Sequence, residues 1–244
     1  MADSTTQSFP ALNPQSVLAV VAHPDDLDFC MAGSLARWAD EGTEVYYLIL
    51  TSGCRGGADI EAMMSLGETR RSEQRAAGDI VGAKDVFFCD YEDGKLEATM
   101  DVKRDIVRYI RQVTPDVVLT IDPTVLYDAK LGLVNHTDHR AAGQAAIDSV
   151  YPLACNRPSF TELLHEGLEP HHVSTLLLVN AEKQNFYVDM SQQFARKQAA
   201  LQAHASQWPG LESSAVMMTT MAQEAGATIG VQYAEGFVRI DLKI

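Results

Sequence analysis

Along the first 150 residues, short apolar runs alternate with stretches in which apolar residues recur every three or four positions. The apolar runs have the length of strands and span residues 17–22, 45–50, 86–89 and 117–121. The stretches between and after them have helical spacing and span residues 32–41, 68–81, 101–113 and 140–147. The pattern therefore predicts strands and helices in regular alternation.

Such alternation predicts an α/β fold. Strand–helix–strand units with right-handed crossovers build a parallel sheet, so we expect a Rossmann-like, mostly parallel sheet flanked by helices. Beyond residue 151 the pattern is less regular. It predicts a strand at 175–179, helices near 192–206 and 214–226, and a closing strand at 237–242. We predict a single domain over residues 1–244, with a core at about 16–206 and a C-terminal extension at 207–244.

Composition narrows the class of protein. The 244 residues are 46% hydrophobic, which is enough for one sizeable core. No apolar run approaches the roughly 20 residues that a bilayer-spanning helix needs. The first eight residues lack a basic cluster and an apolar segment, so we expect no secretory signal and a cytoplasmic location.

Charge and cysteine content exclude further classes. A formal net charge of −14 would repel phosphate backbones and anionic lipid surfaces, so we expect neither nucleic acid nor membrane as a partner. The four cysteines show no C-x-x-C spacing, which favours isolated thiols over a disulfide framework or a thiolate zinc site. A small-molecule substrate is the remaining partner class, and a homo-oligomer stays open.

The first cluster of chemically useful residues is His23-Pro24-Asp25-Asp26, directly after the run 17–22. Open α/β sheets place their sites where buried strands end. His23 and Asp26 are three residues apart and can turn toward one metal ion. Asp25 is adjacent to Asp26 and would point elsewhere, which leaves it free to act as a base.

The second cluster contains His136, Asp138 and His139, just before the predicted helix at 140–147. The two histidines are one helical turn apart. Both could approach one metal, or one could bind while the other polarises a substrate. With His23 and Asp26, one of them completes three protein ligands, and three ligands with an open fourth position are typical of catalytic zinc.

Each residue also has a structural interpretation. A single histidine or aspartate after a strand is more often a loop hydrogen-bonder or helix cap than a metal ligand. Asp138 could cap the helix that begins at His139. The combination of the two clusters favours the metal site.

The two clusters belong to a longer series of motifs. In order along the chain these are Ala22-His23-Pro24-Asp25-Asp26, Gly33, Thr51-Ser52-Gly53, Arg70-Arg71-Ser72-Glu73, Asp93-Gly94, Pro115-Asp116-Val117-Val118 and His136-x-Asp138-His139. The series resembles the LmbE-like, or PIG-L, deacetylase family over residues 16–150, and more loosely toward residue 206. The resemblance implies a Rossmann-like sheet and a zinc-dependent N-deacetylase or amidase.

The resemblance also implies roles for individual residues. His23, Asp26 and His139 would bind one zinc ion, Asp25 would be the general base, His136 the electrostatic or acid partner, and Asp138 would orient a ligand from behind. Arg70 and Asp93 resemble positions that grip the sugar, although both could equally be pairing charges on the surface or on a helix.

The chain departs from the family pattern in places. Thr137 stands where many members have proline, and Val134 stands where some have a tyrosine. The oxyanion role of that tyrosine is therefore unassigned, with Tyr127 and Asn135 as candidates. Leu27 and Asp28 replace the commoner acidic and glycine-rich continuation of the first motif, and we interpret Asp28 as structural.

We therefore expect metal-dependent removal of an acetyl group from an N-acetylglucosamine-like sugar or glycoconjugate. Zinc is the expected metal, but a site of two histidines and an aspartate also accepts iron or cobalt. A thiol-conjugate amidase of the same family is the nearest alternative. A nucleotide-binding protein is less favoured because no G-x-G-x-x-G loop follows the first strand. A non-catalytic metal-binding protein would be expected to lack a base or a ligand.

Overall fold

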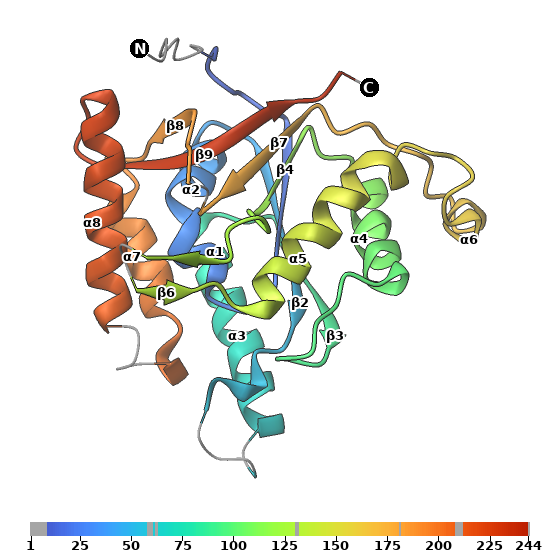
Figure 1. The fold of residues 1–244 in the computed structure, drawn as a ribbon, viewed down its shortest axis with the longest axis horizontal. Coiled ribbons are helices and arrows are strands. Elements are labelled where there is room, and N and C mark those ends of the chain that lie inside the picture. The colour runs from blue at the N-terminus through green and yellow to red at the C-terminus, as the bar shows by residue number, and fades with distance from the viewer. Residues whose placement is uncertain are drawn as a thin grey trace.

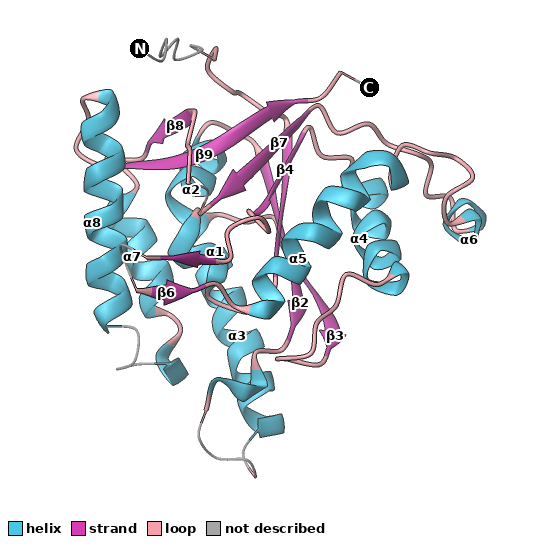
Figure 2. Ribbon diagram, viewed as in Figure 1, coloured by secondary structure: helices cyan, strands magenta, loops and turns pink. Residues whose placement is uncertain are grey.

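The computed structural model describes residues 9–57, 61, 63–129, 132–180, 182–207 and 212–243. Within these residues, seven strands form one sheet in the order β3-β2-β1-β4-β7-β9-β8. They are β1 (Ser16–Val21), β2 (Glu44–Thr51), β3 (Asp85–Tyr91), β4 (Val117–Ile121), β7 (Thr175–Val179), β8 (Phe186–Asp189) and β9 (Ala234–Asp241). A separate antiparallel pair consists of β5 (Tyr127–Asp128) and β6 (Leu133–Val134), drawn as two short arrows in Figure 2.

The helices connect these strands and cover the sheet (Figure 1). They are α1 (Asp26–Cys30), α2 (Ala32–Asp40), α3 (Met63–Val81), α4 (Met100–Val113), α5 (Thr137–Asp148), α6 (Thr161–His165), α7 (Phe194–Gln202) and α8 (Glu212–Ile229). Short helical turns occur at Cys54–Gly56, Ser149–Leu153 and Ala205–Gln207. Among the described residues, no helix is long and apolar enough to cross a membrane.

The sheet is mostly parallel. β1 pairs in parallel with β2 and β4, β2 with β3, and β4 with β7, whereas β9 is antiparallel to β7 and β8. The predicted fold class is thus confirmed. The chain leaves β1 toward β2 on one side and later returns to β4 on the other, so the carboxyl ends of β1 and β4 form the switch point where open α/β sheets hold ligands.

Two apolar layers sandwich the central strands. Alternate residues of β1 point to opposite faces, so Val17 and Ala19 pack with α2, α3 and α7, whereas Leu18 and Val20 pack with α4 and α5. Every residue of β1, β4 and β7 is buried. Burial on both faces explains why these strands are continuous apolar runs in the sequence.

Several local features differ from the prediction. α3 begins at Met63, five residues before the helix that the sequence predicts at 68–81. α1, α6, β8 and the β5–β6 pair are not predicted, because two to five residues are too short for a periodic signal. The C-terminal strand β9 lies inside the main sheet, between β7 and β8.

Candidate active site

The loop after β1 carries His23 to the switch point of the sheet. The Thr51 N–H donates to the Ala22 carbonyl at 2.8 Å, which extends the contact with β2 to the end of the strand. The His23 N–H donates to Oδ2 of Asp26 at 2.8 Å. His23 and Asp26 therefore face each other across one tight turn, and both are buried.

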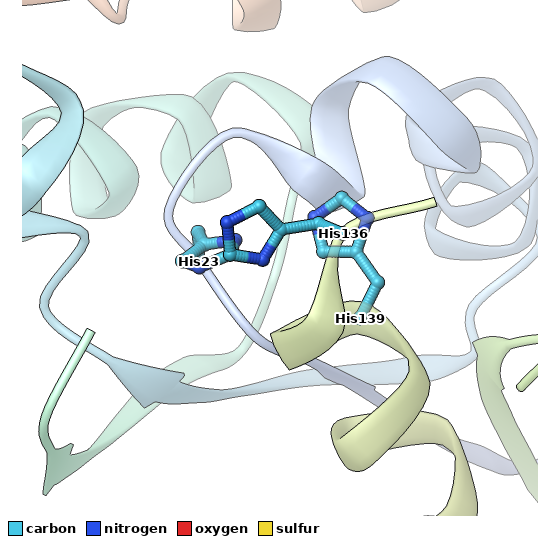
Figure 3. Close-up of side chains that lie close together, drawn as sticks. All are labelled: His23, His136 and His139. Carbon is cyan, nitrogen blue, oxygen red and sulfur yellow. The ribbon is translucent and has the colours of Figure 1, made fainter. Parts of the chain in front are cut away.

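Three histidines meet at this point (Figure 3). His23 comes from the loop after β1, and His136 and His139 come from the start of α5. One ring nitrogen from each lies within 4.8 Å of the others. Residues more than 110 positions apart in the sequence thus provide a compact set of metal-ligating atoms.

Asp26 lies between two of the histidines. Its Oδ1 is 3.0 Å from Nε2 of His139, and its Oδ2 is 3.5 Å from Nδ1 of His23. Burial by itself would raise the pKa of Asp26, but His139 and His23 hold it well below its ordinary value. Asp26 is therefore a carboxylate that contacts one nitrogen of each ring.

Two further carboxylates lie on the other side of the His23 ring. Its Nε2 is 3.2 Å from Oδ1 of Asp93 and 3.3 Å from Oδ2 of Asp138. Asp138 is fully buried and also accepts hydrogen bonds from the N–H groups of Gly94 and Leu96. Carboxylates that hold the distal nitrogen of a histidine fix the orientation of its ring.

Burial and these acids have opposite effects on His23. Burial lowers its pKa, but hydrogen bonds to Asp138, Asp26 and Asp93 raise the pKa to about 12. The surrounding carboxylates therefore favour positive charge at this point.

The second ring nitrogen of His139 has a partner that the sequence reasoning did not assign. Oδ1 of Asn135 is 3.3 Å from Nδ1 of His139, and Nδ2 of Asn135 donates to the Val125 carbonyl at 2.8 Å. Asn135 thus links His139 to the segment preceding β5. The four-residue spacing of Asn135 and His139 across a helix start is the sequence feature that could have predicted this contact. Tyr127, the other candidate for the oxyanion role, is 63% exposed on β5.

His136 is exposed at the N-terminus of α5. Its Nδ1 accepts a hydrogen bond from the Asp138 N–H at 3.1 Å, so the side chain caps the helix. Burial and the charges of His23 and His139 lower the pKa of His136 below its ordinary value. The ring is then neutral at neutral pH, with its proton on Nε2.

Asp25 points away from Asp26 and toward α3. Its Oδ2 is 3.0 Å from Nη2 of Arg70. Burial raises the pKa of Asp25 to about 6, although the charge of Arg70 opposes that shift. The two adjacent aspartates therefore have different partners. Asp25 contacts Arg70, and Asp26 contacts the histidines.

A family model described as GlcNAc-PI de-N-acetylase, PIG-L, matches residues 18–150, which include every residue of this cluster. The chain belongs to the PIG-L family. The resemblance inferred from the sequence motifs is confirmed.

Two relatives of this PIG-L protein are similar over most of its length. Diacetylchitobiose deacetylase from Thermococcus kodakarensis is 32% identical over 231 residues, which are 93% of this chain and 84% of the relative. A Bacillus anthracis protein named "Probable N-acetyl-alpha-D-glucosaminyl L-malate deacetylase 2" is 28% identical over 235 residues, which are 91% of this chain and 93% of the relative.

A solved structure shares the fold of this PIG-L protein. N,N'-diacetylchitobiose deacetylase from Pyrococcus horikoshii, complexed with an inhibitor, superimposes with a TM-score of 0.86 at 30% sequence identity. The match covers 94% of this chain and 85% of that structure. The mixed sheet and its helical layers are therefore those of a deacetylase fold.

In the PIG-L protein described here, the side chains of Arg70 and Asp93 are both buried against protein groups. The Arg70 guanidinium donates to the carbonyls of Gly53 and Pro24 as well as to Asp25. Asp93 contacts His23 and accepts from the Arg55 N–H at 2.7 Å. A sugar contact by either side chain stays a prediction.

The donor atoms of the PIG-L cluster suit a divalent transition metal. Imidazole nitrogen and carboxylate oxygen are ligand types of zinc, iron and cobalt. Two sets of described residues have ligand atoms close enough to share an ion: His23 with His136 and His139, and His23 with Asp93 and Asp138. Asp26 contacts both His23 and His139 but belongs to neither set, so its role as a metal ligand stays a prediction.

Proposed function

We propose that this chain is a zinc-dependent hydrolase that removes the acetyl group from an N-acetylglucosamine-like sugar or glycoconjugate. The observation that carries the proposal is that the two adjacent aspartates after β1 contact different groups. His23, Asp26 and His139 form one contact cluster, and Asp25 lies beside it with a different partner. A metal site with an adjacent, unligated carboxylate can supply both the Lewis acid and the general base for amide hydrolysis.

The proposed metal ligands are Nδ1 of His23, a carboxylate oxygen of Asp26 and Nε2 of His139. Asp138 and Asp93 would hold His23 from its other nitrogen, and Asn135 would do the same for His139. When bound, zinc or another divalent transition metal would polarise the amide carbonyl and lower the pKa of a coordinated water to about 7.

We assign the general base to Asp25. A base must be deprotonated to accept a proton, and a pKa of about 6 leaves Asp25 mostly deprotonated at neutral pH. Its raised pKa also makes it a better proton acceptor than an ordinary aspartate. The Arg70 guanidinium donates to the Asp25 carboxylate and holds it in place.

We assign to His136 the stabilisation of the negative charge that develops on the substrate oxygen. Because its Nδ1 accepts from the Asp138 N–H, the neutral ring carries its proton on Nε2. That N–H would be a fixed donor to the developing oxyanion. The neutral state favours this role over that of a protonated acid.

The names of the relatives support the substrate class, because both identify deacetylases of N-acetylglucosamine derivatives. The test uses zinc-loaded protein with N-acetylglucosamine, N,N'-diacetylchitobiose, a thiol conjugate and a simple aliphatic acetamide. Free amine and acetate are measured. We expect equal amounts of both products from an N-acetyl sugar and far less from the aliphatic amide, since sites that bind hydroxyls reject analogues lacking them.

One result of this assay would contradict the proposal. If the zinc-loaded protein releases no amine from either sugar but cleaves the thiol conjugate or the aliphatic amide, the deacetylase proposal is wrong. The amidase alternative would then replace it.

A further inference from the structure

Three buried polar side chains lie behind Asp25 and have no part in the chemistry above. They are Asp28 of α1, Gln74 of α3 and His204, which follows α7. Each of the three residues is 0% exposed. Buried polar groups cost stability unless they are hydrogen-bonded, so their partners indicate what they do.

The three side chains form one connected chain of hydrogen bonds that ends on Asp25. The Asp25 N–H donates to Oε1 of Gln74 at 2.9 Å. Nε2 of Gln74 donates to Oδ2 of Asp28 at 2.8 Å, and Nε2 of His204 donates to the same oxygen at 2.8 Å. Within the described residues, Oδ1 of Asp28 and Nδ1 of His204 have no hydrogen-bond partner. Both bonds to Asp28 therefore converge on one oxygen.

This arrangement determines which end of the Gln74 amide faces Asp25. An amide group has a donating end and an accepting end. A carboxylate can only accept, so Asp28 takes the NH₂ end, and the carbonyl end of Gln74 must face the Asp25 N–H. His204 in turn fixes Asp28, because its ring donates to the oxygen that Gln74 uses.

Asp25 has a backbone conformation that needs such support. Its φ of 89° and ψ of −27° lie in the left-handed region, which residues other than glycine rarely adopt. Strained conformations persist where the surrounding structure holds them. Arg70 and Gln74, one turn apart on α3, hold Asp25 at the carboxylate and at the backbone N–H respectively.

We propose that Gln74, Asp28 and His204 form a positioning relay that holds the backbone of Asp25 in its left-handed conformation and so directs its carboxylate at the reacting groups. The inference rests on the proposed function of Asp25 as general base. All three are fully buried and out of reach of a substrate, so we class them as positioning residues rather than catalytic ones.

The test compares variants that break the relay with one that preserves it. Gln74→Leu and Asp28→Leu keep side-chain bulk but remove the hydrogen bonds. Asp28→Asn removes the charge but retains a carbonyl oxygen that can accept from both Gln74 and His204. The matched control is Ser149→Ala, which removes a partly buried hydrogen bond to the Lys103 carbonyl near the C-terminus of α5.

Four quantities are measured for each variant: kcat, KM, bound zinc, and the hydrogen–deuterium exchange rate of the Asp25 amide. We expect both leucine variants to retain zinc, to keep KM, and to lose about 10- to 100-fold in kcat, the cost of misplacing a reacting group by about 1 Å. Their Asp25 amide should exchange faster. Asp28→Asn should keep most of the turnover and the slow exchange, and Ser149→Ala should match the wild type.

The proposal is overturned if the leucine variants resemble Ser149→Ala, or if Asp28→Asn is as impaired as Asp28→Leu. Should Gln74→Leu not fold, Gln74→Met carries the same expectations. If the wild type itself cleaves no acetamide, the proposed function fails while the exchange data still decide the relay. Faster exchange of the Asp25 amide in both leucine variants supports the relay, and unchanged exchange in Asp28→Leu contradicts it.

Discussion

Two groups of buried charges in this protein are balanced in different ways. Lys197 of α7 and Glu235 of β9 are 2% and 6% exposed and form an ion pair. Glu235 also accepts hydrogen bonds from the N–H groups of Gly33 and Ser34 at the start of α2. One cation and one anion thus satisfy each other, and the carboxylate stabilises a helix terminus.

Around His23 the numbers of acidic and basic side chains differ. Four carboxylates gather there among the described residues, and they are Asp25, Asp26, Asp93 and Asp138. Arg70 contacts the first of them, and the remaining three surround His23. Buried charge that is not compensated within the protein is expensive. The difference teaches that the pair at Lys197 is balanced by its own two members, whereas the cluster at His23 gathers more carboxylates than a single ion pair needs, as the proposed metal site would require.

The largest effect on turnover should follow from removing the proposed general base, Asp25, from the acidic cluster. We expect Asp25→Ala to retain bound metal and to lose about 10²- to 10⁴-fold in turnover, the usual contribution of a general base. Metal analysis and amine release from the same preparation check both statements.

The companion variants separate the roles of neighbouring residues. Asp26→Ala and His139→Ala should lose metal as well as turnover, because each removes a proposed ligand. Loss of metal from Asp25→Ala with full occupancy in Asp26→Ala would reverse the two assignments.

A smaller effect, on stability rather than on chemistry, should follow from breaking the balanced pair. Lys197→Met leaves Glu235 buried without its cation, which should cost about 3–5 kcal/mol in the free energy of unfolding. Turnover per folded molecule should not change. Urea unfolding measures the cost, and a Lys197→Met, Glu235→Gln double variant should recover part of it. A double variant no more stable than Lys197→Met would contradict this account.

The smallest effect concerns pH and the buried pair of His204 and Asp28. Burial lowers the pKa of His204, and the charge of Arg70 lowers it further. The hydrogen bond and charge of Asp28, with a contribution from Asp25, outweigh both and raise the pKa above 6.5. Because the folded protein binds this proton more tightly than the unfolded chain, the stabilisation is complete below pH 6.5 and is lost as the pH rises through the folded-state pKa.

The measurement is the difference in unfolding free energy between the wild type and His204→Gln across that range. We expect the wild-type advantage to shrink as the pH increases. A difference that grows with pH would show that His204 is neutral in the folded state.

Much of the fold could be predicted because its central strands are buried on both faces. β1, β4 and β7 are continuous apolar runs for that reason, and their predicted positions agree with the structure to within one residue. β8 and α1 have four and five residues, too few to show a period, and were missed. The start of α3 was placed at residue 68 instead of 63, because its first turn carries little amphipathic signal.

The sequence by itself determined the fold class, the family and the residues that gather at the switch point, because the motifs around His23 and His139 are local and each follows or begins a readable element. Tertiary structure alone decided their partners. Gln74 and His204 are single polar residues without a motif, and folding brings residue 204 to 2.8 Å from residue 28. Sequence patterns record local spacing, whereas the partners of a buried polar group depend on which distant segments pack against it.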